Sequence, residues 1–439
     1  MRDIGAWLAL RGLRAFAFQE RCWAAWRAGE SGLVQVPTGS GKTWAATLAA
    51  LSEIQPGGGL QLLYLTPLRA LSRDITLAIA APTQGPGALA PGVQVEARTG
   101  DTSSSVRSRQ KRRPPEVLVT TPESLCLMLC EEDASLRLGS LRTVVVDEWH
   151  ELCGSKRGTQ VELALARLRS YAPGLRCWGL SATLPESEAA AAALAGAGKP
   201  YRVITSDLRR EVVLETLLPP QAEVLRQAGH SGLRMVPALL KWLDPERSTL
   251  IFTNTRSQAE RWFAALGLSM PEWEPILALH HGSLERETRE EVEAGLKEGR
   301  IKLVVCTSTL DLGVDFGPVD RVVQVGSPKG IARLLQRAGR SGHRPGARAE
   351  VLCVPTHMLE ILEFAATRDA IGRGQLEPRM PLTGPLDVLV QHMVTCAMGG
   401  GFDPIELYSE LRSTRAYQDL SPDDFDMVLR LVRDGGVLH

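Results

Sequence analysis

Short apolar runs that end at polar turns recur along most of this chain, and they constrain its fold more than any other feature. Each run has strand length and precedes an amphipathic or Ala-rich stretch. This pattern is typical of parallel strands that helices bury on both faces. The first series reads GLVQVP, LQLLYLTP, EVLVTTP, RTVVVDE and CWGLSAT, and the second reads STLIFTNT, ILALHHG, KLVVCTS, DRVVQVG and AEVLCVPT. The sequence therefore predicts an α/β fold with two tandem parallel-sheet domains.

From about residue 378 the apolar residues recur at helical spacing instead. The stretches are PLDVLVQHMVTCAM, DPIELYSELRST and SPDDFDMVLRLVRDGG, and Ser421 with Asp424 resembles a capping box. We interpret this region as a mostly helical winged-helix module, which we expect to be truncated. The expected domains are residues 1–205 and 225–375 for the two sheets, a linker at 206–224, and the winged-helix domain at 376–439.

Composition limits the classes of partner and compartment. Fifty Lys+Arg and 50 Asp+Glu give a formal net charge of zero, so any nucleic-acid contact must be local. The eight cysteines form no CxxC pair and no cluster at zinc spacing, and Cys126 and Cys130 fit core packing better than metal binding. The N-terminal charges are too close together for a signal peptide, so we expect none, and no apolar run approaches the roughly 18 residues that a membrane span needs. We expect a bacterial cytosolic, nucleoid-associated protein without membrane contact.

The first expected strand runs into a phosphate-binding loop. Residues 36–43 read VPTGSGKT, which matches G-x-x-x-x-G-K-[ST] except that Val36 stands at the first Gly position. Backbone N–H groups of such a loop surround phosphates, the lysine neutralises the β/γ oxygens, and the last hydroxyl reaches Mg²⁺. The candidate nucleotide-binding residues are Thr38, Gly39, Ser40, Gly41, Lys42 and Thr43.

Two adjacent carboxylates, Asp147 and Glu148, stand at the end of the strand RTVVVDE. Like charges repel, and such pairs are tolerated where a cation lies between them and an anion. Asp147 would hold Mg²⁺ through water, and Glu148 would orient and deprotonate the water that attacks the γ-phosphate. The alternative, a surface turn with two solvated acids, fits poorly with a buried strand that delivers them. Together with the loop, the pair predicts hydrolysis of ATP with Mg²⁺.

Further motifs follow in an order that resembles superfamily 2 helicases. Those of the first half are TPLRAL (66–71), RTGD (98–101), TTPESL (120–125), DEWH (147–150) and SAT (181–183). They resemble motifs Ia, Ic, Ib, II and III. Those of the second half are LIFTNTRSQAE (250–260), HHGSLERE (280–287), CTSTLDLGVDF (306–316) and QRAGRSGHR (336–344). They resemble motifs IV, IVa, V and VI, so the resemblance implies two RecA-like domains.

Three motif sequences indicate which family of superfamily 2 helicases the chain resembles. The DExH form, GLRAFAFQ (12–19) and GPLDVLVQH (384–392) look like the Lhr-type helicases, and DEWHEL is most similar to the ligase-associated DExH-box DNA helicase branch. The resemblance implies an ATP-dependent DNA helicase or translocase that moves 3′ to 5′ on single-stranded DNA and serves DNA repair. The implied partners are single-stranded DNA or a forked or hybrid duplex, and by family association a DNA ligase and a nuclease.

The resemblance also implies roles for single residues around the nucleotide. Gln19 matches the glutamine that reads the adenine edge, with Phe16 or Phe18 as the nearby aromatic residue. Motif VI aligns Gln336 with a residue facing the nucleotide and Arg340 with the arginine finger. Ser181 and Thr183 would couple hydrolysis to domain movement, and His150 would link motif II to the domain interface. The remaining nucleotide candidates of the second domain are Asp315, the weaker finger Arg337, and His343 or Arg344 as a second finger.

Backbone-binding positions are implied on both domains. They are Thr66, Arg69, Thr121 and Ser124 on the first and Thr255, Arg256 and Thr307 on the second. Hydroxyl and guanidinium groups suit phosphate contacts, which carry no sequence code, and several of these residues also suit helix capping. The densest basic run, RSRQKRRPP (107–115), is either a solvated loop or a further nucleic-acid contact.

Two alternatives to a DNA helicase stay open. One uses the same chemistry on RNA or an RNA:DNA hybrid. The other is a nucleic-acid-binding clamp with little motor activity, against which the intact Lys42, Asp147, Glu148 and Arg340 argue.

Overall fold

The computed structural model describes residues 3–37, 39–69, 71–182, 185–206, 211–219, 231–311, 319–341 and 348–435. The chain divides into two compact units. The first comprises Met1–Val36, Ser40–Asp207 and Pro378–His439, and the second comprises Pro37–Gly39 and Leu208–Glu377. The C-terminal residues thus belong to the same unit as the first sheet.

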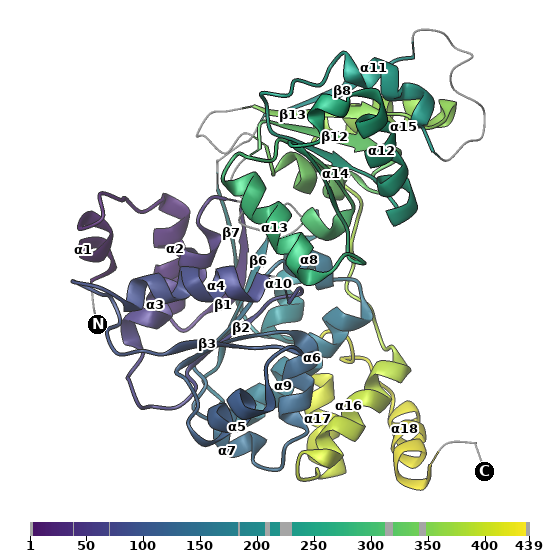
Figure 1. Cartoon of the computed structure of the whole chain (residues 1–439). Helices are drawn as coiled ribbons and strands as arrows, with labels where there is room; N and C mark the ends of the chain where they lie inside the picture. Colours follow the sequence, from purple (N-terminus) through teal and green to yellow (C-terminus); the bar gives the residue numbers. More distant parts are fainter. Residues whose placement is uncertain are drawn as a thin grey trace. The chain divides into compact units, whose positions relative to one another are not determined.

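A seven-stranded sheet in which neighbouring strands run parallel forms the centre of the first unit (Figure 1). Its strands are β1 Ser31–Gln35, β2 Leu62–Leu65, β3 Val95–Arg98, β4 Val117–Thr120, β5 Thr143–Val146, β6 Arg176–Ser181 and β7 Tyr201–Thr205. They lie in the order β3-β4-β2-β5-β6-β1-β7. The five predicted strands are confirmed, and every residue of β2, β4 and β5 is buried, which explains their uninterrupted apolar sequences. The edge strands β3 and β7 are additional.

Helices cover both faces of this sheet. α2 Ala17–Arg27, α3 Lys42–Glu53 and α4 Leu71–Ala80 pack together on one face, and α1 Ile4–Ala9 lies against α3. The other face shares one apolar core with α6 Pro122–Leu129, α7 Ala134–Leu138, α8 Trp149–Leu152, α9 Lys156–Tyr171 and α10 Ser187–Ala195. The connections thus bury the sheet on both sides and leave the ends of its strands to carry polar residues.

The second unit contains a six-stranded parallel sheet in the order β10-β11-β9-β12-β13-β8. Its strands are β8 Val212–Thr216, β9 Thr249–Phe252, β10 Leu277–His280, β11 Leu303–Cys306, β12 Arg321–Val325 and β13 Ala349–Val354. Its helices are α11 Val236–Leu240, α12 Arg256–Ser269, α13 Arg286–Lys297, α14 Ile331–Ala338 and α15 Met358–Gly372.

Two local expectations differ from the structure. The expected linker at 206–224 contains β8, because the β-branched segment Val212–Thr216 pairs with β13 at the edge of the second sheet. The basic run at 107–115 is largely helical rather than a loop. It lies mostly in α5 Ser104–Arg112, whose N-terminal N–H group at Val106 is capped by the Ser103 side chain.

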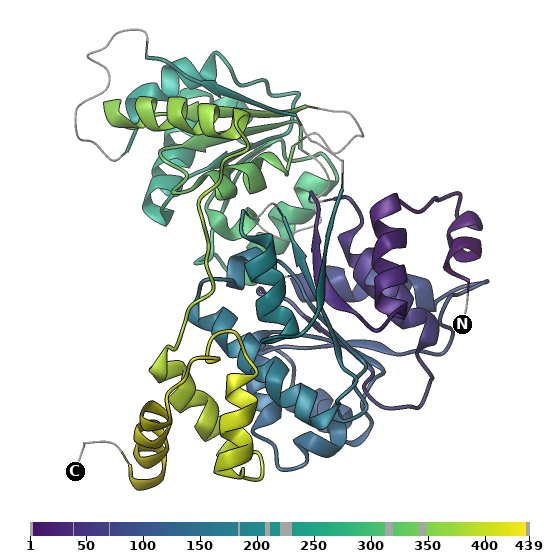
Figure 2. The same cartoon turned by 180° about the vertical axis from the view of Figure 1, so that it is seen from behind.

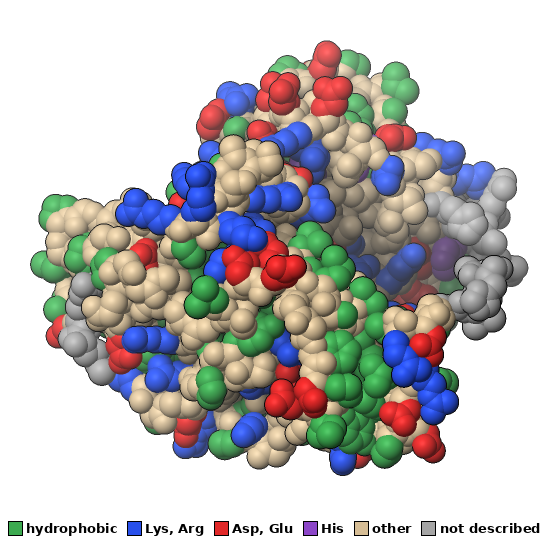
Figure 3. Space-filling model, turned by 90° about the horizontal axis from the view of Figure 1, so that it is seen from below, with side chains coloured by type: hydrophobic (Ala, Val, Ile, Leu, Met, Phe, Trp, Pro, Cys, Tyr) green, Lys and Arg blue, Asp and Glu red, His purple; other side chains and the backbone are tan. Residues whose placement is uncertain are grey.

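The C-terminal region folds into α16 Leu386–Met398, α17 Pro404–Arg412 and α18 Pro422–Asp434, as the helical spacing predicted. The Ser421 side chain accepts the N–H of Asp424, which confirms the cap. The three helices share a core that includes Leu163 of α9, and Figure 2 shows them beside that helix. Seen from below, hydrophobic side chains form a band on the face that carries these helices (Figure 3). The fold prediction of two parallel-sheet domains and a helical module is confirmed.

Within the part of the chain that the structure describes, no helix has both the length and the apolarity to cross a membrane.

Candidate functional site

The predicted motifs of the first domain lie where parallel strands end, at the carboxyl edge of the sheet. This edge is where α/β proteins bind ligands. The phosphate-binding loop follows β1, the DEWH motif follows β5, and Ser181 is the last residue of β6. Because β5, β6 and β1 are neighbours in the sheet, these three motifs converge, whereas the residues after β2 and β4 occupy the next part of the same edge.

The loop that begins α3 depends on left-handed glycines. Gly39 has φ of 76° and Gly41 has φ of 85°, a region that favours glycine. A Cβ atom at Gly41 would also stand 2.8 Å from Gln19 Nε2. Lys42 begins the helix, and its buried ammonium has no hydrogen-bond partner among the described residues. A buried cation without such a partner suits an anionic ligand. Thr38 lies outside the described residues.

Gln19 connects the segment before β1 to this loop. Its Nε2 donates to the Gly41 carbonyl oxygen at 3.2 Å, and its Oε1 accepts the Phe16 N–H at 3.0 Å. The Phe16 ring is 47% exposed and stacks on the buried Phe18 at 5.8 Å between centroids. Of the two aromatic residues that the resemblance left open, Phe16 is therefore the one with an exposed ring.

The carboxylates of the DEWH motif have unusual surroundings. Asp147 is 8% exposed, and burial, followed by the Glu148 charge, raises its pKa to about 7, which the Lys42 charge opposes. Glu148 adopts a left-handed conformation with φ of 46°, which is strained for a residue with a side chain. Its Oε1 lies 3.8 Å from Lys42 Nζ. The motif thus holds two acids and a lysine together at a cost in desolvation and strain.

His150 joins the DEWH motif to the end of β6. Its Nδ1 accepts the Ala182 N–H at 3.3 Å, so this nitrogen carries no proton. Burial lowers the pKa of His150, which favours the neutral imidazole that this contact requires. Ser181, the residue before Ala182, is fully buried. Its hydroxyl has no hydrogen-bond partner among the described residues. Thr183 lies outside the described residues.

The oxygen groups of this edge fit Mg²⁺. Magnesium prefers oxygen ligands and is usually held by one or two protein groups together with phosphate and water. Asp147 supplies a buried carboxylate, and Thr43 is the second residue of α3, directly after Lys42. Burial, followed by the Asp147 charge, raises the pKa of the nearby Tyr64 phenol well above its usual range. The described residues contain no cluster of three or more His, Cys, Asp or Glu that would compete as an all-protein metal site.

The strand-facing candidates of the first domain follow β2 and β4. Thr66 is fully buried, whereas Arg69 is exposed and pairs with Asp101 at 3.2 Å, which joins TPLRAL to RTGD. Thr121 caps α6 by accepting the Ser124 N–H at 3.3 Å. The capping role that the sequence left open for these hydroxyls is therefore present at Thr121.

The second domain repeats this arrangement after β9 and β11. Thr255 is exposed and caps α12 by accepting the Gln258 N–H at 3.2 Å, and Arg256 follows it, also exposed. Thr307 is buried at the end of β11.

The described part of motif VI, residues 336–341, lies at the end of α14 and directly after it. Arg340 donates to the Asp311 carbonyl oxygen at 2.9 Å and is partly exposed, and Gln336 is buried. Arg337 is 1% exposed, forms an ion pair with Asp311 at 2.7 Å and donates to Gln324. Arg337 therefore serves the interior of the domain. Three candidates, Asp315, His343 and Arg344, lie outside the described residues.

Three families match this chain in the order of its domains. The DEAD/DEAH box helicase family matches residues 16–191, the helicase conserved C-terminal domain matches 232–345, and the large helicase-related protein winged helix domain matches 369–438. The ATP-dependent helicase Lhr-Core protein 2 of Thermococcus barophilus is 36% identical over 92% of this chain and 49% of its own length. The Lhr helicase/probable uracil glycosylase of Mycolicibacterium smegmatis is 33% identical over 94% of this chain and 30% of its own.

Over more than nine-tenths of its length the chain is similar to the Lhr-type helicases of superfamily 2. The structure of Mycobacterium smegmatis helicase Lhr bound to ssDNA and AMP-PNP matches it with a TM-score of 0.85 and 34% identity, covering 94% of this chain and 55% of the other. The DUF1998 helicase MrfA, in a structure bound to DNA and AMPPNP, is 24% identical with a TM-score of 0.78 over 98% of this chain and 59% of its own, and shares the fold. The chain spans about half the length of the Lhr-Core relatives.

Sequence reasoning missed two arginines that contact the predicted motifs. Arg157, in the first turn of α9, donates to the Pro67 carbonyl oxygen at 2.9 Å and pairs with Glu123 at 2.7 Å, so it bridges TPLRAL and α6. Arg379 donates to the His150 carbonyl oxygen at 2.6 Å. Both partners are remote in sequence, so no local pattern indicates these contacts.

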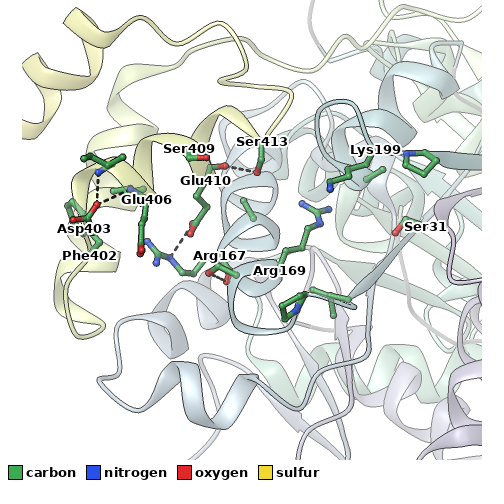
Figure 4. A pocket seen from close by; sticks show the side chains of 18 of the residues that line it. Ser31, Arg167, Arg169, Lys199, Phe402, Asp403, Glu406, Ser409, Glu410 and Ser413 are labelled. Carbon is green, nitrogen blue, oxygen red and sulfur yellow. Dashed lines mark hydrogen bonds and ion pairs between the residues drawn. The ribbon is translucent and has the colours of Figure 1, made fainter.

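A large cavity of about 1330 Å³ lies elsewhere, between α9 and α17. Figure 4 shows Arg167 and Glu410 facing one another in it, with their ion pair at 3.2 Å, and Arg169 and Lys199 on the other side. Ser31, the first residue of β1, also lines it. The cavity is therefore at the opposite end of that strand from the phosphate-binding loop.

Proposed function

We propose that this chain is an ATP-dependent helicase or translocase that moves on single-stranded DNA. The observation that carries the proposal is the carboxyl edge of the first sheet. There a buried lysine ammonium, which has no hydrogen-bond partner in the described part of the chain, lies 3.8 Å from a strained glutamate, beside an aspartate with a raised pKa. Strain and desolvation concentrate at functional sites, and these three groups have the chemistry that phosphoryl transfer requires.

Each group has a task in this proposal. Backbone N–H groups of Gly39, Ser40 and Gly41 bind phosphate oxygens, and Lys42 neutralises them. Thr43 and Asp147 would hold Mg²⁺, which supplies charge stabilisation at the phosphates when bound. Glu148 orients the attacking water and takes its proton. Gln19 and the exposed Phe16 ring would bind the adenine, and Gln336 and Arg340 are the second domain's candidates for nucleotide contact.

The nucleic acid would be gripped through its backbone. Thr66, Arg69, Thr121 and Ser124 on one domain and Thr255, Arg256 and Thr307 on the other offer hydroxyl, guanidinium and helix N-terminal groups suited to phosphates. The Lhr structure with ssDNA and AMP-PNP supports both ligands for this chain. Movement from 3′ to 5′, a role in repair with a ligase and a nuclease, and membership of the ligase-associated branch rest on the resemblance of DEWHEL and are part of the proposal.

The basic run on α5 contributes less to this grip than its sequence suggests. Arg109 pairs with Glu96 at 2.7 Å, and Lys111 pairs with Glu131 at 3.1 Å and Asp133 at 3.5 Å. Acids of the same domain therefore offset much of the positive charge that would attract phosphates.

Steady-state ATP hydrolysis by the wild type and Glu148→Gln tests the proposal. Each protein is assayed without polynucleotide, with single-stranded DNA, and with RNA of matched sequence at one salt concentration, because phosphate contacts are salt-dependent. We expect DNA to stimulate the wild type and the variant to lose about 10²- to 10⁴-fold of the stimulated rate, which is the usual contribution of a general base.

The outcomes separate the candidate functions. Stimulation by RNA alone indicates an RNA or hybrid unwindase. Equal, unstimulated rates in both proteins indicate a nucleic-acid clamp and contradict the role of Glu148.

A further inference from the structure

The segment between α15 and α16 lies against the helix that carries the DEWH motif. The Arg379 guanidinium donates to the His150 carbonyl oxygen at 2.6 Å and lies 3.8 Å from the Glu151 carboxylate. Its backbone carbonyl accepts the Cys153 thiol at 3.6 Å. At Gly154, just after α8, a Cβ atom would stand 2.9 Å from the Met380 carbonyl oxygen, so the two backbones are in close contact. We call residues 378–380 the strap.

The strap also contacts the chain that follows SAT. The Arg379 N–H donates to the Glu186 carboxylate at 3.1 Å, and Glu186 is the residue before α10. His150 in turn accepts the Ala182 N–H. One arginine therefore contacts two segments: the one after β5, to which the proposed function assigns hydrolysis, and the one after β6, to which the family resemblance assigns its coupling to domain movement.

Helix α8 is short enough for this contact to matter. It has four residues, so its carbonyl groups lack most of the intrahelical partners that a longer helix supplies. Trp149 fixes one side of it by donating to the Ala190 carbonyl oxygen at 2.9 Å. Arg379 fixes the His150 carbonyl, close to the strained Glu148. A shift of the strap would therefore tilt α8 about its tryptophan and displace the catalytic carboxylate.

The winged-helix module does not need Arg379 to stay attached. It is anchored on α9 by the Lys156–Asp387 ion pair at 2.6 Å, the Arg167–Glu410 ion pair at 3.2 Å, and an apolar core that includes Leu163. Among the described residues, the two groups that the Arg379 guanidinium contacts, the His150 carbonyl oxygen and the Glu151 carboxylate, both belong to α8. The Arg379 contact is thus not needed to attach the winged-helix module to the first domain, and it acts on α8.

We propose that Arg379 is a positioning residue for ATP hydrolysis, which holds α8 and Glu148 in register with the winged-helix module. This inference rests on the proposed function and deepens it. Strand-dependent movement of the module would reach the hydrolytic site through the strap, and nucleic-acid stimulation would be transmitted along this contact.

The test compares Arg379→Ala, Arg379→Lys and the control Lys156→Ala, which removes another cation between the module and the first domain without touching α8. Turnover is measured with and without single-stranded DNA over a range of ATP concentrations, and the thermal midpoint of each protein is recorded. For Arg379→Ala we expect the DNA-stimulated kcat to fall about tenfold, as for loss of a charge-assisted contact to a catalytic segment, with KM for ATP changed less than about twofold. Arg379→Lys should recover about half of the loss on a logarithmic scale.

The control separates positioning from loss of structure. Lys156→Ala should keep the wild-type kcat, with a thermal midpoint similar to that of Arg379→Ala. Equal stimulated kcat values in Arg379→Ala and Lys156→Ala would overturn the inference, and so would a loss in Arg379→Ala that Arg379→Lys does not reduce. A wild type without nucleic-acid stimulation contradicts the proposed function itself, so the two failures are distinct.

Discussion

The two sheets have similar strands, but the charged groups near their carboxyl edges differ in how well they are paired. In the first domain Lys42 lacks a hydrogen-bond partner among the described residues, Asp147 is buried with a raised pKa, and Glu148 is strained. In the second domain the buried Arg337 is fully engaged by Asp311 and Gln324. Unsatisfied, strained groups are destabilising unless a ligand engages them, whereas a paired network stiffens the fold. The difference indicates that the first edge carries the chemistry.

The buried network of the second domain extends beyond motif VI. His280 at the end of β10 contacts the Thr309 hydroxyl at 2.9 Å and the Glu293 carboxylate at 3.0 Å. With Arg337 and Asp311, these groups tie two helices and the turn after β11 to the sheet. A satisfied network of this kind stiffens the domain.

The largest effect on stability is expected from breaking that network. Arg337→Met leaves the Asp311 carboxylate buried without its ion pair, and such losses cost about 3–5 kcal/mol of the free energy of unfolding. Arg333→Met is the matched control, because Arg333 lies on the same helix, is 39% exposed and approaches the same carboxylate only to 3.9 Å. Denaturant unfolding measures both. Equal losses in the two variants would contradict the contrast between the two edges.

The next effect is the pH dependence that Asp147 imposes on the nucleotide-free protein. Its folded-state pKa of about 7 lies above the unfolded value of about 4. The folded state therefore binds this proton more tightly, and the stabilisation present below pH 4 is lost as the pH rises to 7. Asp147→Asn should remove this loss, which is on the order of 2–4 kcal/mol. Unfolding at pH 4 and pH 7 measures the difference.

Asp387→Asn is the control for that experiment. The Lys156 side chain lowers the pKa of Asp387, so its contribution has the opposite sign and is lost as the pH falls. Asp387 is exposed, so this opposite trend should be small. The same pH slope in the Asp147→Asn variant and the wild type would show that this carboxylate is not the origin of the pH dependence.

The sequence predicted the edge that carries the chemistry better than it predicted the surroundings. Strands such as VVV before Asp147 and GLV in β1 are buried on both faces, so their apolar runs are continuous and their polar ends are easy to locate. The edge strands β3 and β7 have partly exposed positions, so their sequences lack that signal. The sequence of motif VI left both Arg337 and Arg340 as candidates for the arginine finger. Only their burial in the structure distinguishes them.

Contacts between residues far apart in the sequence could not be predicted, for a different reason. Arg379 and His150 are 229 positions apart, and neither residue type nor local spacing marks the pairing. The same is true of Glu162, whose carboxylate accepts the Ala416 N–H at 3.1 Å and whose pKa burial raises to about 8. Such contacts depend on how the C-terminal helices pack on α9, which periodicity within each helix does not specify.

A smaller effect is expected from relieving the strain at Glu148. Glycine adopts the left-handed region without the penalty that a side chain incurs, so Glu148→Gly should stabilise the nucleotide-free protein by about 1 kcal/mol relative to Glu148→Ala. Both variants should lack stimulated turnover. Thermal or denaturant unfolding measures the difference, and a glycine variant no more stable than the alanine variant would show that the conformation at Glu148 carries little strain.

The smallest change in stability is expected at Lys42, where the two edges differ most in function. The ammonium is buried without a hydrogen-bond partner among the described residues, and its ion pair with Glu148 is long, at 3.8 Å. Replacing it with the apolar stem of methionine therefore removes a desolvated charge at the cost of that long ion pair and of the attraction to Asp147. Lys42→Met should change the free energy of unfolding by less than about 1 kcal/mol, yet reduce ATP turnover at least about 100-fold, because the phosphates lose their buried cation. Denaturant unfolding and stimulated ATP hydrolysis on one preparation measure both quantities. A Lys42→Met protein as destabilised as Arg337→Met would mean that the lysine supports the fold as the arginine does. The contrast between unsatisfied groups at the first edge and paired groups at the second would then be wrong.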